Sequence, residues 1–108
     1  MRRNSRDVME TKMQIIALLR RRTEKFADAD FAPVLPDESQ QRRVLYAAGL
    51  IRQIWNRTDV PGTAFMLETT DIGEANRQLE TLPLVKAGMM EITTITGLVP
   101  YPGFGPAK

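Results

Sequence analysis

Four segments of the chain have the length and composition of β-strands. The first is a compact run of Ile and Leu that is apolar on both faces, so we expect neighbours on both sides of it. The second and third flank a turn-forming cluster that contains Pro61 and Gly62, which predicts a β-hairpin. The predicted strands cover residues 13–20, 50–57, 63–69 and 89–96.

A helix is predicted between the first two strands, over residues 36–48. Pro36 suits the first turn of a helix, and the two acidic residues that follow it suit the positive end of the helix dipole. Gly49 is placed to cap the C-terminus. The apolar face of this helix is expected to consist of Val44, Leu45 and Ala48.

A second helix is predicted between the third and fourth strands. Asp71, with Glu74 three residues later, forms a start that resembles a capping box. Pro83 is expected to end this helix. Apolar residues at helical spacing predict its buried face: Ile72, Ala75, Leu79 and Leu82.

The order β-α-β-β-α-β predicts an α+β domain with a ferredoxin-like antiparallel sheet and both helices on one face. The other face also looks apolar, because strict alternation in the fourth strand sets Met90 and Ile92 against Met89 and Ile95. A sheet with two apolar faces needs a second layer. A second copy of the chain is the expected layer, which gives a dimeric α+β barrel. The chain is therefore expected to form a homodimer or a higher homo-oligomer built from dimers.

The chain divides into three predicted parts. Residues 1–12 are polar and basic without periodicity and are expected to form a flexible N-terminal arm. Residues 13–96 form the ferredoxin-like α+β domain. Residues 97–108, rich in glycine and proline, are expected to form an extended C-terminal arm that packs on the partner subunit.

Composition excludes several classes of function. Of 108 residues, 43% are apolar and 26% charged, as in ordinary globular proteins. The net charge of +2, and first and fourth strands without aromatic residues, give no support for nucleic-acid binding. The chain has no cysteine and no histidine, so neither a metal site nor a cofactor is expected. Without a long apolar run or a signal-peptide pattern, no membrane partner and a cytoplasmic location are expected.

Several residues between positions 50 and 91 resemble the muconolactone isomerase family of the dimeric α+β barrel class. That family carries a Trp in the second strand, an acidic residue at the end of the third, a Leu-Pro-Leu that closes the second helix and a Glu in the fourth strand. The chain departs from the family in its lack of histidine, so another group must carry any proton that histidine carries there. The matching residues are Arg52, Trp55, Glu68, Leu82, Pro83, Leu84 and Glu91.

The resemblance implies a cofactor-free isomerase, or a lyase-like enzyme, that moves a proton within a small organic acid or lactone. Glu91 and Glu68 are the candidate catalytic groups. Inside a barrel, Glu91 would sit among Met89, Thr93 and Ile95, where desolvation favours the neutral form of a carboxyl group.

Four further residues are candidates for substrate binding. Arg52 or Arg20 is expected to hold the substrate carboxylate by paired hydrogen bonds. Trp55 would form a flat apolar wall, and Tyr101 would close the mouth of the cavity.

Each of these assignments has a structural alternative. A glutamate on a strand is also typical of an edge position or of an ion pair with arginine, and Trp55 is also typical of core or dimer packing. The run of three arginines that begins at Arg20 is typical of a solvated strand end. Strict alternation places Arg52 and Trp55 on opposite faces of their strand, so the two would not line one cavity.

Two other classes of function remain open. The absence of histidine and cysteine favours a non-catalytic dimer that binds a small ligand or serves as a structural module. The same barrel class also hosts cofactor-free monooxygenases, but one Trp and two Tyr provide little of the aromatic lining that this chemistry uses.

Overall fold

The fold is built on a four-stranded antiparallel sheet, seen in a computed structural model that describes residues 11–105. The strand order across the sheet is β2-β3-β1-β4. The two central strands, β3 and β1, pair along their full length, with Met13 opposite Thr69 and Arg20 opposite Gly62. The strands are β1 (Met13–Arg21), β2 (Ile51–Asn56), β3 (Gly62–Thr69) and β4 (Met90–Leu98).

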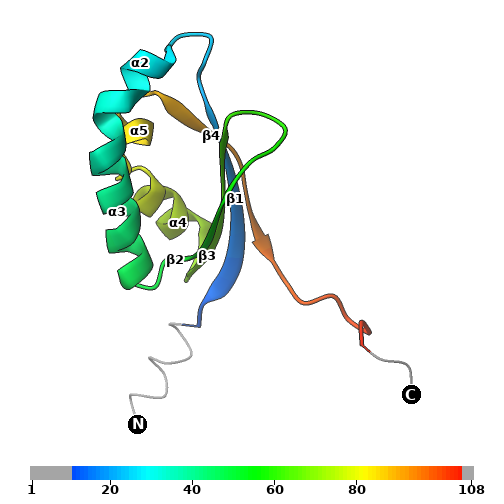
Figure 1. Ribbon diagram of the computed structural model, residues 1–108. Coiled ribbons are helices and arrows are strands. Elements are labelled where there is room, and N and C mark those ends of the chain that lie inside the picture. Colours follow the sequence, from blue (N-terminus) through cyan, green and yellow to red (C-terminus); the bar gives the residue numbers. More distant parts are fainter. Residues whose placement is uncertain (1–10, 106–108) are drawn as a thin grey trace.

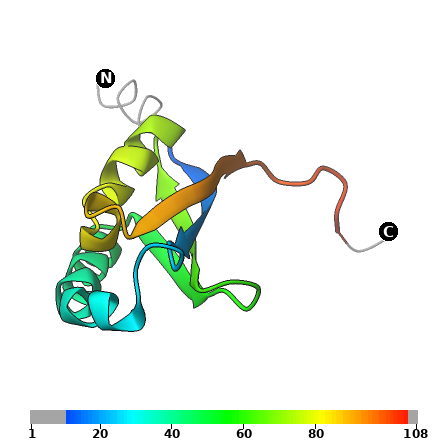
Figure 2. The ribbon, with the colours of Figure 1, turned by 90° about the horizontal axis from the view of Figure 1, so that it is seen from above.

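All helices lie on one face of this sheet (Figures 1 and 2). The first crossover, from β1 to β2, contains α2 (Asp28–Phe31), the 3-10 turn η1 (Ala32–Val34) and α3 (Leu35–Ala47). The second crossover, from β3 to β4, contains α4 (Ile72–Leu79) and α5 (Pro83–Lys86). The predicted βαββαβ order is confirmed, and the arrangement is consistent with the ferredoxin-like fold.

The core lies between the sheet and the helices. Ile15, Ala17 and Leu19 alternate along β1 and are fully buried, as their period of two predicts. Phe65 and Leu67 of β3 lie beside them and are equally buried. Burying side chains of this size accounts for most of the free energy that holds the helix layer on the sheet.

The predicted helix ends are largely confirmed. Asp71 precedes α4, and its Oδ1 accepts a hydrogen bond from the backbone N–H of Glu74 at 2.7 Å, which satisfies one orphan donor of the first turn. Gly49 follows α3 with φ of 88°, a left-handed conformation that glycine adopts without a Cβ penalty.

Two helix predictions are wrong. Pro83 does not end α4 but begins the separate helix α5, since Leu82 before it has an extended ψ of 129°. Of the three apolar residues predicted for the first helix only Leu45 is buried, while Val44 is 46% exposed. The buried contacts of α3 instead include a charged residue, Glu38, which is 2% exposed.

The prediction of two apolar faces on β4 is also wrong. The register with β1 shifts, so that Leu19 pairs with Ile92 while Leu18 pairs with Thr94. This extra residue is a β-bulge, which breaks strict alternation. Ile92 and Ile95 consequently both pack against the core on the helix side. The strand also continues through Leu98 and includes the first two residues of the predicted arm.

Beyond Leu98 the chain runs away from the body of the domain, as Figures 1 and 2 show. Val99, Tyr101 and Phe104 in this segment are 77% exposed or more. The predicted N-terminal arm falls almost wholly outside the described residues. Among residues 11–105, no helix has the length and apolar character needed to cross a membrane.

Candidate functional site

The sheet face without helices is formed by the residues that alternate with the buried positions of β1 and β3. Ile16 pairs with Met66 and Leu18 with Ala64, and all four side chains are partly exposed. We call this surface the open face. It consists of Ile16, Leu18, Arg20, Ala64, Met66 and Glu68, with the residues of β2 and β4 that pair beside them.

At one end of the open face, Arg20 lies between two carboxylates. Its Nη2 donates to Glu91 Oε1 at 2.8 Å, and its Nη1 donates to Glu24 Oε1 at 3.0 Å. The hydrogen bond from Arg20 is the main cause that lowers the pKa of Glu24 to about 2, and the same bond raises the pKa of Arg20. This end therefore carries a compact cluster of fixed charges.

Glu91 does not have the apolar neighbourhood that was predicted for it. Its side chain is 45% exposed and contacts the guanidinium of Arg20. The bulge in β4 turns Ile95 toward the core instead. Glu91 is accordingly a surface carboxylate beside a cation in the single chain.

At the other end of the open face, Arg52 Nε lies 3.7 Å from Glu68 Oε1. The register between β2 and β3 shifts after Ile51, which pairs with Leu67, so that Gln53 pairs with Met66. This bulge places Arg52 against Glu68, and Trp55 pairs with Ala64 on the same face. Arg52 and Trp55 therefore share one side of the sheet, contrary to the strict-alternation argument.

The six predicted site residues do not gather in one place within a single chain. On β1, Arg20 contacts Glu91, whereas Gln14 lies opposite Glu68. These two positions are six residues apart, roughly 20 Å at the rise of a strand, so the two glutamates lie at opposite ends of the open face. Trp55 lies between these two ends and is 47% exposed. Tyr101 lies in the extended segment and contacts the ring of Phe104 edge to face.

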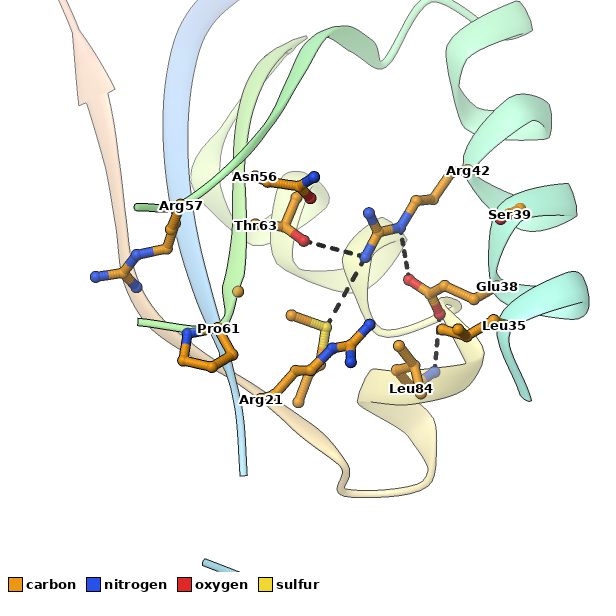
Figure 3. Close-up of a pocket in the computed structure, with 12 residues that line it drawn as sticks. Arg21, Leu35, Glu38, Ser39, Arg42, Asn56, Arg57, Pro61, Thr63 and Leu84 are labelled. Atoms are coloured by element: carbon orange, nitrogen blue, oxygen red, sulfur yellow. Dashed lines mark hydrogen bonds and ion pairs between the residues drawn. The ribbon is translucent and has the colours of Figure 1, made fainter. Parts of the chain in front are cut away.

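Sequence reasoning missed a cavity of about 310 Å³ on the helix side of the sheet. It lies between α3, α5 and the β2–β3 hairpin, and Figure 3 shows Arg21, Glu38 and Arg42 around it. Glu38 accepts a hydrogen bond from Arg42 Nε at 2.7 Å and one from the backbone N–H of Leu84 at 2.9 Å. These contacts satisfy a carboxylate that is almost wholly buried.

The guanidinium of Arg42 also holds the sheet side of this cavity. Its Nη2 donates to Thr63 Oγ1 at 3.3 Å, and its central carbon lies 5.2 Å from the ring centre of Phe65. The signal in the sequence was the spacing of Glu38 and Arg42, four residues apart on one helix. That spacing is common on solvated helix faces, so burial could not be inferred from it.

No model of a known protein family matches this chain, and no curated protein matches it significantly. The likeness to muconolactone isomerases therefore remains a proposal. Among residues 11–105, no cluster of acidic side chains is arranged to hold a metal ion.

Proposed function

We propose that two copies of this chain associate through their open faces and form a dimeric α+β barrel. Ile16, Leu18 and Met66 supply a partly exposed apolar centre on a sheet that residues 11–105 leave uncovered on this side. Contiguous apolar surface of this kind is typical of an interface. Packing against a second sheet would remove it from water.

The C-terminal segment supports the same partner. Val99 and Phe104 are 84% and 86% exposed, and the segment that carries them leaves the domain without folding back on it (Figure 2). Large apolar side chains on an extended strand gain stability only by packing on another surface. A second copy offers that surface next to the end of β4.

We further propose that the space between the two sheets accepts a small organic acid or lactone and transfers a proton within it. The observation that carries this proposal is the contact of Arg20 with Glu91, a cation and a carboxylate side by side on the open face. Arg20 binds the substrate anion and Glu91 moves the proton. The substrate competes with Glu91 for the guanidinium and so releases the carboxylate for chemistry.

The other end of the open face offers the same two groups. Glu68 is the second proton-transfer group, Arg52 the second anion-binding group and Trp55 the apolar wall beside them. Tyr101 closes the cavity from the extended segment. Enclosure between two sheets lowers the local dielectric and strengthens each of these charge interactions. The resulting activity is a cofactor-free isomerisation of the kind that the resemblance to muconolactone isomerases implies.

One observation favours a second candidate function, a dimer without catalysis. Both glutamates lie next to an arginine in the isolated chain. Such contacts also suit ion pairs that fix the register of two subunits. In that case the open face binds a partner copy and transforms no substrate.

The test of the enzymatic proposal is deuterium incorporation from heavy water, followed by NMR across a panel of small lactones and hydroxy acids. The wild type is expected to exchange the acidic C–H of at least one compound. Glu91→Gln is expected to slow this exchange by about a hundredfold or more, and Glu68→Gln is measured beside it.

The matched control is Glu80→Gln at the C-cap of α4, where the carboxylate contacts Asn76 away from the open face. It is expected to leave the rate unchanged. Full rates in both the Glu91 and Glu68 variants would overturn the catalytic roles. A dimer with no exchange on any compound would favour the function without catalysis.

A further inference from the structure

The cavity on the helix side is independent of the open face. Its walls come from α3, from the hairpin between β2 and β3, from the start of α5, from the end of β1 and from the start of β4. None of the six residues proposed for the open face lines it. Its volume of about 310 Å³ lies in the lower range of small-molecule sites.

The charge of this cavity is positive. Three arginines and one carboxylate, that of Glu38, line it. Arg57 is neutralised by Asp59, which accepts its Nη2–H at 2.6 Å and its Nε–H at 2.9 Å. The hydrogen bond with Arg57 is the main cause that lowers the pKa of Asp59 to about 2. Figure 3 shows the Arg57 guanidinium turned away from the cavity.

The two inward arginines differ in how far they are already used. Arg42 is engaged by Glu38 and Thr63 through two of its three nitrogens. Arg21 forms no ion pair with any acidic residue in the described range 11–105. Its guanidinium lies 4.6 Å from the ring centre of Phe31, which holds the charge in place without neutralising it.

The remaining lining suits an organic body behind an anionic head. Ser39 and Asn56 contribute polar groups to the lining, and Leu35, Pro61 and Met90 contribute apolar surface. A guanidinium presents several N–H donors in one plane, which match the oxygens of a carboxylate or phosphate. The cavity thus combines a fixed cation, adjacent polar groups and an apolar wall.

We propose that this cavity binds a small organic anion, whose oxyanion head group contacts Arg21 and the free nitrogen of Arg42. Carboxylate and phosphate share the chemistry that the two arginines recognise. The body of the ligand packs on Met90 and Leu35. The site would operate in the monomer and in the dimer alike, because it faces away from the open face.

The experiment is calorimetric titration of the full chain at low salt with four probes. Benzoate and phenyl phosphate carry the two head groups on one body, inorganic phosphate carries no body, and benzamide is the neutral counterpart of benzoate. At least one organic anion is expected to bind more tightly than benzamide. The stronger of the two organic anions identifies the head group.

Two variants locate the binding. Arg21→Gln removes the guanidinium that forms no ion pair within residues 11–105. It is expected to weaken binding of the organic anion by about tenfold or more. Asn56→Asp adds a negative charge to the lining and is expected to weaken it without disturbing the contact between Arg21 and Phe31. The second variant keeps the test valid if the first fails to fold, because Asn56 is exposed.

Two controls make the same changes in net charge elsewhere. Arg77→Gln acts on α4, where Arg77 pairs with Glu74, and Gln40→Glu acts on the exposed side of α3. Both are expected to bind the anion as the wild type does. Equal weakening in all four variants would overturn the proposal, as would binding of benzamide equal to benzoate or no binding of any anion at millimolar concentration.

Discussion

Arg20 and Arg21 are neighbours in β1, yet their guanidinium groups serve opposite faces of the sheet. Arg20 donates to Glu91 on the open face at 2.8 Å. Arg21 lies over the ring of Phe31 on the helix side and lines the cavity there. The alternation of a strand thus divides one basic run between two separate candidate sites.

The buried contacts of Glu38 predict a large effect on stability. Glu38→Ala is expected to lower the free energy of unfolding by about 3–5 kcal/mol, because it leaves the Arg42 charge and the Leu84 N–H without their partner. Denaturant unfolding measures this change. Glu80→Ala, at the exposed C-cap position after α4, is the control and is expected to change stability by less than about 0.5 kcal/mol. Similar values for the two variants would contradict the structural role of Glu38.

Gly62 predicts a steric effect at the start of β3. A Cβ at this position would overlap the carbonyl oxygen of Leu19 and lie 2.9 Å from the Cα of Arg20. Because the backbone cannot shift without strain, Gly62→Ala is expected to lower the free energy of unfolding by about 1–3 kcal/mol. Thermal unfolding should show a midpoint lower by several degrees. Gly105→Ala, where a Cβ meets no atom within 4 Å, should leave the midpoint unchanged. An unchanged midpoint for Gly62→Ala would refute the close approach.

The pair of Arg20 and Glu24 predicts a dependence of stability on pH. The pKa of Glu24 is about 2 in the folded chain, against an ordinary 4.5. Its stabilising contribution is therefore fully present above about pH 4.5 and is lost as the pH falls through about 2. The difference in unfolding free energy between wild type and Glu24→Gln should shrink over that range.

The matched test of this pH effect uses Arg20→Gln as the background. Without the guanidinium, Glu24→Gln should no longer produce a difference that shrinks between about pH 4.5 and about pH 2. A difference that persists in this background would assign the effect to another partner of Glu24.

The open face predicts that a charge at its centre prevents association. Met66→Glu is expected to give the mass of one chain, 12.2 kDa, in sedimentation equilibrium, whereas the wild type is expected to give twice that mass. The physical reason is the cost of burying an unpaired carboxylate between two sheets. Val44→Glu on the helix layer also replaces an exposed apolar residue and should leave the dimer intact. A Met66→Glu protein with the mass of the wild type would exclude this face as the interface.

Much of the fold could be predicted from local pattern. The alternation of Ile15, Ala17 and Leu19 and the cap at Asp71 are determined by neighbours in the chain, and the structure confirms them. The β4 bulge could not be predicted, because it depends on pairing with β1, which is distant in sequence. Pro83 suits both the end of one helix and the start of the next, so the residue alone does not decide between them.

For the two candidate sites, the sequence likewise indicated some single residues but not the contacts between residues that are distant in the chain. Sequence indicated Arg20, Glu91, Arg52 and Glu68 as candidates, but the two pairs that they form join residues of different strands. The helix-side cavity was missed because Glu38 reaches Leu84, which lies 46 positions away. A charged residue in the first turn of a helix is normally exposed, and only the tertiary packing buries this one.

The association of two open faces is tested most directly by the distance between two spin labels, one on each copy. The chain has no cysteine, so Thr94→Cys on the open side of β4 and Val44→Cys on α3 each introduce one labelling site. Facing sheets pack roughly 10 Å apart, and each helix layer adds about another 10 Å. If the two open faces pack together, a dipolar coupling is expected between Thr94→Cys labels at a distance clearly shorter than that between Val44→Cys labels. No coupling at Thr94→Cys, or a shorter distance at Val44→Cys, would contradict this association.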